Sequence, residues 1–112
     1  MSIKRLLIAN RGEIAVRIVR AAKAMGIKTI QVYSEADADM LACKQADVTV
    51  CVGGAAAKDS YLNIPNILAA AKETDADAVH PGYGFLAESA KFAQAVVDAG
   101  MIWVGPAAAT ID

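Results

Sequence analysis

The chain contains few of the residues that disulfide frameworks, metal centres and catalytic triads require. Two cysteines, Cys43 and Cys51, and one histidine, His80, occur among its 112 residues. The cysteines are too far apart for a C-x-x-C redox pair and too few for a zinc site, so we expect them to be small buried hydrophobic residues of a cytoplasmic protein. We expect no signal peptide. A single histidine would need unsuited partners to form a Ser-His-Asp triad or a histidine-based metal site.

The chain also lacks a strong net charge, long apolar segments and many aromatic residues. Its formal net charge of -1 gives no field that would attract nucleic acid or anionic lipid, and we expect neither as a partner. The apolar segments are far shorter than the roughly 18 residues of a membrane-spanning helix. The composition is 56% hydrophobic but only 5% aromatic. Such an interior consists mainly of Ala, Val, Ile and Leu, which suits helices packed closely on a sheet.

Short apolar segments alternate with helical patterns along the sequence. The segments predicted as strands are 3–9, 28–33, 47–52, 76–80 and 101–104. The predicted helices are 13–25, a weakly periodic segment at 41–45, a helix that begins after the N-cap Asn63, and about 89–99. A chain of this length forms one domain. The alternation predicts an α/β fold: an open, parallel, five-stranded, Rossmann-like sheet with helices on both faces.

The first predicted helix has an apolar side and a basic side. Its inner face is predicted to consist of the apolar residues at helical spacing, which are Ile14, Ile18, Ala21, Ala22 and Met25. Arg17 and Arg20 belong to the opposite face, which is most simply solvated, with Glu13 and Arg17 as an i, i+4 pair. A contact with another subunit is the alternative for these two arginines.

Ligands of parallel sheets bind outside the carboxyl ends of the strands, and a dinucleotide there would require G-x-G-x-x-G after the first strand. The turn at 10–13 instead carries Arg11 and Glu13 where glycines and a phosphate should lie, although Glu35 could serve as a ribose-binding acid. A second glycine pattern, at 82–87, follows the fourth predicted strand, and no acid ends the fifth. A dinucleotide-dependent oxidoreductase is therefore disfavoured.

Two further sets of polar residues are expected to be structural. His80 should hydrogen-bond to backbone at the end of its strand and set the following loop, and its bond to Pro81 is a candidate for the cis form. Glu35, Asp37 and Asp39 could hold a hard cation, but an evenly spaced acidic loop is usually a solvated turn. We assign no metal site.

The loop at 82–85 is the most informative feature for function. It contains two glycines and two aromatic residues directly after a predicted strand. This composition lets backbone N–H groups and a ring face meet a ligand. A simple tight turn is the alternative.

Three long motifs in this sequence resemble the N-terminal signatures of biotin carboxylases. They are LIANRGEIA at 7–15, SYLNIP at 60–65 and HPGYGFL at 80–86. The resemblance extends from Lys4 to Ile111. It does not separate acyl-CoA, pyruvate and urea carboxylases, although we favour the alpha subunit of an acyl-CoA carboxylase such as acetyl- or propionyl-CoA carboxylase.

The resemblance implies a ligase that uses ATP, Mg²⁺ and bicarbonate, through carboxyphosphate, to carboxylate biotin. Residues 1–112 would form only its N-terminal (pre-ATP-grasp) domain. The ATP-grasp and C-terminal domains, absent from this chain, would supply the catalytic residues, so the chain alone is expected to be inactive. By position in the motifs, Tyr83 and Gly84 would face biotin, and Arg17 and Arg20 would lie near a dimer contact. Ala24 stands where some members place an acid, which weakens the case for that contact.

The implied partners are the remaining biotin carboxylase domains, a biotin carboxyl carrier domain and a carboxyltransferase component, with a homodimer as the assembly. One alternative is the same domain of a pyruvate or urea carboxylase. A second alternative, from another functional class, is a non-catalytic Rossmann-like binding module.

Overall fold

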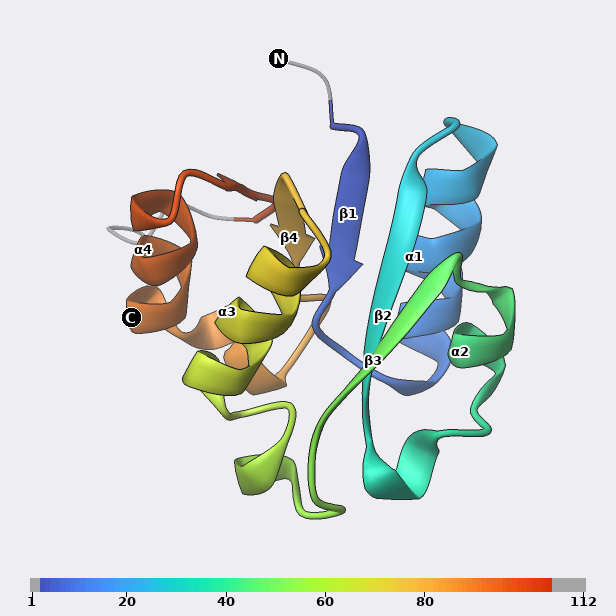
Figure 1. Ribbon diagram of the computed structural model, residues 1–112, viewed down its shortest axis with the longest axis horizontal. Helices are drawn as coiled ribbons and strands as arrows, with labels where there is room; N and C mark the ends of the chain where they lie inside the picture. Colours follow the sequence, from blue (N-terminus) through green and yellow to red (C-terminus); the bar gives the residue numbers. More distant parts are fainter. Residues whose placement is uncertain (1–2, 106–112) are drawn as a thin grey trace.

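The computed structural model describes residues 3–105, which form a five-stranded parallel sheet between two layers of helices (Figure 1). The strands are β1 (Arg5–Ile8), β2 (Lys28–Ser34), β3 (Val48–Gly53), β4 (Ala78–His80) and β5 (Ile102–Trp103). The α-helices are α1 (Gly12–Ala24), α2 (Leu41–Gln45), α3 (Ile64–Glu73) and α4 (Ala90–Asp98). Single 3₁₀ turns occur at η1 (Glu35–Asp37), η2 (Ala57–Asp59) and η3 (Phe85–Glu88). The predicted fold class is confirmed.

The strand order β3-β2-β1-β4-β5 places β1 at the centre of the sheet, next to β4. Alternate residues of each strand point to opposite faces. On one face, Leu6 and Ile8 pack in a core with α1 and α2, and on the other face Leu7 packs with residues of α3 and α4. Because β1 and β4 are neighbours, the loops that follow them meet at the carboxyl edge of the sheet.

Helices α3 and α4 each begin at a polar side chain that caps the first turn. Asn63 Oδ1 accepts a hydrogen bond from the backbone N–H of Asn66 at 3.1 Å, and Pro65 occupies the first turn of α3. Ser89 Oγ accepts from the N–H of Phe92 at 3.1 Å at the start of α4. The predicted N-cap of α3 is confirmed, and Ser89 caps its helix as expected of this residue type.

The inner face predicted for α1 was wrong in large part. The buried residues of the helix are Ala15, Val16, Val19 and Ala22. Ile14 and Ile18 are only half-buried, and Met25 is 75% exposed. The helix carries apolar residues over a wide arc, and α1 packs on β1 and β2 beside α2, so one edge of that arc is buried and the other lines a cavity.

The predicted burial of both cysteines was also wrong. Cys51 is exposed and Cys43 is half-buried. Strand β3 is an edge strand of the sheet, and its exposed residues Thr49 and Cys51 alternate with residues that are partly or fully buried. An apolar run predicts a buried strand. Only the strand order shows that β3 lies at the edge of the sheet, where it has a neighbouring strand on one side alone.

Candidate functional site at the carboxyl ends of β1 and β4

Asn10 joins the loop after β1 to the loop after β4. Its side chain lies in the interior, with the residue 3% exposed. Nδ2 donates hydrogen bonds to the carbonyl oxygens of Pro81 at 2.7 Å and Tyr83 at 2.6 Å. Oδ1 accepts from the backbone N–H of Arg11 at 2.8 Å. One carboxamide therefore fixes both loops, which are about 70 residues apart in sequence.

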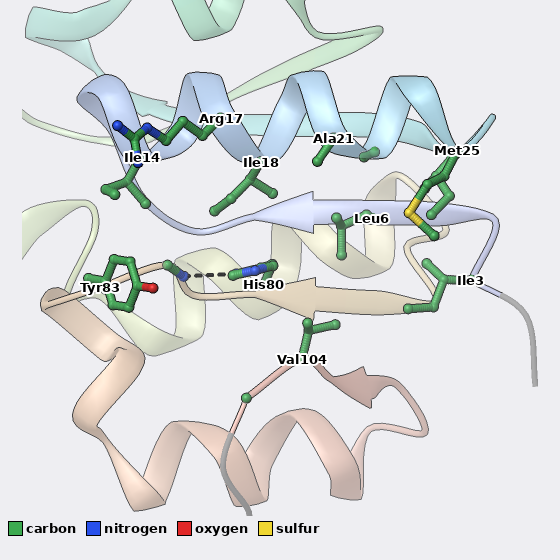
Figure 2. Close-up of a pocket in the computed structure, with 14 residues that line it drawn as sticks. Ile3, Leu6, Ile14, Arg17, Ile18, Ala21, Met25, His80, Tyr83 and Val104 are labelled. Atoms are coloured by element: carbon green, nitrogen blue, oxygen red, sulfur yellow. Dashed lines mark hydrogen bonds between the residues drawn. The ribbon is translucent and has the colours of Figure 1, made fainter.

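The start of the β4 loop is fixed from a second side. His80 Nδ1 accepts a hydrogen bond from the backbone N–H of Gly82 at 3.0 Å, which Figure 2 marks as a dashed line. Burial lowers the pKa of His80, so the neutral imidazole that can accept this bond is favoured. The expected backbone bond of His80 is confirmed. The bond to Pro81 is trans, so the cis form considered for it is wrong.

Tyr83 is 78% exposed at one end of a cavity of about 660 Å³ (Figure 2). Ile14 and Arg17 of α1 lie across the cavity from it, and Met25 and Ile3 line the far end. The cavity floor includes Leu6 of β1, His80 of β4 and Val104 after β5. The cavity therefore has a polar mouth beside Tyr83 and an apolar far end.

The two arginines predicted to lie near a dimer contact, Arg17 and Arg20, have different neighbours in the structure. Arg17 lines the cavity and lies 3.4 Å from Glu13 as the predicted i, i+4 pair. Arg20 instead donates from Nε to Gln45 Oε1 at the end of α2, at 3.3 Å. Both are exposed, and Arg17 is the one close to Tyr83. Gly84 has φ +67 and no atom lies within 4 Å of where its Cβ would be, so the loop is open at this residue.

A charged cluster forms after β1 and β2 around the buried carboxylate of Asp37, with the Arg11 side chain half-exposed. The Arg11 guanidinium contacts Asp37 through Nε at 2.9 Å and one NH₂ group at 2.6 Å, while Tyr61 and Ser34 hydroxyls donate to Asp37 Oδ2 at 2.7 and 3.0 Å. The Arg11 hydrogen bond is the main reason that the pKa of Asp37 falls to about 2, despite the opposing effect of burial. Burial, with the bond to Asp37, raises the pKa of Tyr61 to about 12. Asp37 is therefore a structural anion, and the solvated turn predicted for it was wrong.

Sequence reasoning missed Asn10 and the Asp37 cluster. Asn10 and Arg11 lie inside the motif at 7–15 and Tyr61 inside the motif at 60–65, but their partners come from other loops. Only the strand order brings them together. In residues 3–105, no group of three His, Cys, Asp or Glu side chains could hold a metal ion. No helix in the same range is long and apolar enough to cross a membrane.

Comparison with known proteins agrees with this arrangement. The family model described as "Biotin carboxylase, N-terminal domain" matches residues 2–111. Biotin carboxylase 1 of Bacillus subtilis is 58% identical over 109 residues, which cover 97% of this chain and 24% of that protein. The biotin-dependent acyl-coenzyme A carboxylase alpha3 subunit of Mycobacterium leprae is 50% identical, with 97% and 18% covered.

Among solved structures, urea carboxylase of Kluyveromyces lactis superposes with a TM-score of 0.95 at 45% identity, covering 97% of this chain and 10% of that one. The chain thus spans about a quarter of the length of the biotin carboxylases it matches. The match of the family model over nearly all residues, and the shared fold, show that this chain belongs to the biotin carboxylase N-terminal domain family.

Proposed function

We propose that this chain is the N-terminal domain of a cytoplasmic biotin carboxylase that uses ATP, Mg²⁺ and bicarbonate to carboxylate biotin. The observation that carries the proposal is the exposed ring of Tyr83, held at the mouth of a cavity by a family motif. An aromatic face of this kind suits the flat ureido ring of biotin, and the neighbouring Gly84 leaves space for it. The loop 83–84 would form the biotin-facing wall.

The described residues do not fit ATP or Mg²⁺. The turn after β1 carries Arg11, committed to Asp37, and Glu13 at the start of α1, where a phosphate would be repelled. Residues 3–105 also offer no metal-binding trio. Nucleotide and metal chemistry would therefore belong to other domains of the full-length protein, and the isolated 112-residue chain would be inactive.

Acyl-CoA carboxylase is the proposed enzyme class. The 50% identity to an acyl-CoA carboxylase alpha subunit over 97% of this chain supports this choice. The same domain of a pyruvate or urea carboxylase is the alternative. The proposed partners are the remaining biotin carboxylase domains, a biotin carboxyl carrier domain and a carboxyltransferase component. A homodimer contact through the exposed Arg17 and Arg20 is part of the same proposal.

The role of Tyr83 can be tested in the full-length protein. Replacing Tyr83 by Ala should lower the biotin-dependent rate at subsaturating biotin by roughly five- to thirty-fold, because an aromatic stacking contact contributes about 1 to 2 kcal/mol. The matched control Tyr83→Phe keeps the ring and should stay close to wild type. The KM for ATP should be unchanged in both. Normal biotin kinetics in Tyr83→Ala would contradict the biotin-facing role.

A further inference from the structure

Resting on the proposed function, we propose that Asn10 is a positioning residue. It holds the loop 81–84, and with it the Tyr83 ring, in the place where biotin would meet it. Nothing in the composition of the turn at 10–13 marks Asn10 for this task, because its partners lie in the loop after β4.

The hydrogen bonds of Asn10 account for both N–H groups of its carboxamide. Nδ2 donates to Pro81 O and Tyr83 O, the two carbonyls that flank Gly82. The remaining oxygen accepts from Arg11 N–H, so the amide orientation is fixed by its own turn. The backbone carbonyl of Asn10 in turn accepts from Gln31 Nε2 at 2.7 Å within the sheet interior. This bond anchors the backbone of Asn10 to the fully buried side chain of Gln31.

The loop is also packed against Asn10 without spare room. Gly82 has φ +67, and a Cβ there would lie 2.7 Å from Asn10 Nδ2 and 2.9 Å from Ile14 Cγ2. The backbone of Gly82 can therefore lie on the carboxamide only because it has no side chain. The two residues fit each other, and neither can change alone without moving the loop.

The position of Tyr83 depends on this backbone contact more than on packing of its ring. The side chain is mostly exposed, so few neighbours hold it, while its carbonyl oxygen accepts the shortest hydrogen bond of Asn10. Asn10 itself is buried beneath the loop and does not line the cavity. Its effect on biotin would pass through Tyr83, which makes it a positioning residue rather than a catalytic one.

The test uses the full-length protein and two variants of Asn10. Asn10→Asp has nearly the same shape but sets an oxygen against two carbonyl oxygens, and Asn10→Ser is neutral and too short to bridge them. The control is Asn66→Asp, which removes a carboxamide that donates to Val52 O at 2.7 Å, far from the cavity. Each change is made with Tyr83 and with Tyr83→Ala. Biotin KM, ATP KM, kcat and amide exchange of segment 82–88 are measured.

With Tyr83 present, both Asn10 variants should raise the biotin KM and the exchange rate of segment 82–88 roughly tenfold, the scale of one lost buried hydrogen bond. The ATP KM should not change. In the Tyr83→Ala background, the Asn10 changes should add little to the biotin KM. The Asn66→Asp control should alter none of these quantities.

Equal effects of the Asn10 variants in both backgrounds would overturn the inference, because Asn10 would then act by another route. The inference would also be overturned if Tyr83→Ala raised the biotin KM while both Asn10 variants left the biotin KM unchanged. The proposed function would stand in that case. If Tyr83→Ala itself leaves the biotin KM unchanged, the proposed role of the loop fails and, with it, the link from Asn10 to biotin. Segment exchange would then still decide whether Asn10 holds the loop.

Discussion

Gly82 and Gly84 both have a positive φ but lie in different surroundings. Both have φ +67, which L side chains rarely adopt, and the ψ of -164 at Gly84 belongs to a region that is essentially confined to glycine. Only at Gly82 would a Cβ collide with neighbouring atoms, namely Asn10 Nδ2 and Ile14 Cγ2. The pair therefore compares a glycine whose backbone conformation alone disfavours a side chain with one that is also closely packed between loop and helix.

Gly82→Ala should destabilise the 112-residue chain more than Gly84→Ala does. Both variants introduce backbone strain of about 1 to 3 kcal/mol, and Gly82→Ala should lose about a further 1 to 3 kcal/mol of stability from overpacking. Urea unfolding followed by circular dichroism gives the two free energies of unfolding. Equal values would show that the loop moves away from Asn10 without cost, and would weaken the case for a fixed loop.

Asp37 ties three elements together, because it takes hydrogen bonds from the loop after β1, the end of β2 and the segment before α3. Its pKa of about 2 lies below the ordinary value of 3.8, so its contribution to stability is present above about pH 4. The contribution is lost as the pH falls from about 4 to about 2. The shift corresponds to about 2 kcal/mol.

Asp37→Asn should therefore make the free energy of unfolding less dependent on pH between about pH 4 and pH 2. Relative to wild type, the variant should be about 2 kcal/mol less stable at pH 6, and the difference should shrink toward pH 2. Asp39→Asn in the same loop is the control, because Asp39 is exposed and its loss should change stability by less than about 0.5 kcal/mol. Denaturant titrations at several pH values measure both. A constant difference across pH would mean that Asp37 acts through packing rather than charge.

At the scale of elements, the sequence predicted the type of each secondary-structure element more accurately than its position in the fold. The apolar periods identified strands and helices that the structure contains, with the fifth strand shorter than expected at Ile102–Trp103. The spacing of apolar residues does not predict the order of the strands in the sheet. For that reason the edge position of β3, the exposure of Cys51 and the packed arc of α1 could not be predicted. Exposure of Tyr83 could be predicted, because flanking glycines at a strand end seldom bury a ring.

The same limit applied to the candidate site. Asn10 meets Pro81 only because β1 and β4 are neighbours in the sheet, and Tyr61 reaches Asp37 only because the segment before α3 returns to the end of β2. Each contact spans many residues of sequence. Motifs identified the loops, and the topology supplied their partners.

In the whole molecule, one face of the sheet is incompletely covered. The cavity beside α1 is lined by an apolar stripe from Ile14 to Met25 and by strands β1 and β4 (Figure 2). Relatives of this chain are about four times longer, since the match covers 24% of their length. We therefore propose that another domain of the full-length protein packs on the Met25 end of this cavity, leaving the Tyr83 end open to biotin.

This placement predicts that Met25→Lys affects the full-length protein but not the isolated chain. Met25 is 75% exposed here, so the substitution should change the stability of the 112-residue chain by less than about 0.5 kcal/mol. In the full-length protein, a charge buried in an apolar contact should cost several kcal/mol and lower the melting temperature by several degrees. Val97→Lys is the matched control, because Val97 is 53% exposed on α4, away from the cavity. Equal melting shifts for the two variants in the full-length protein would place the interdomain contact elsewhere.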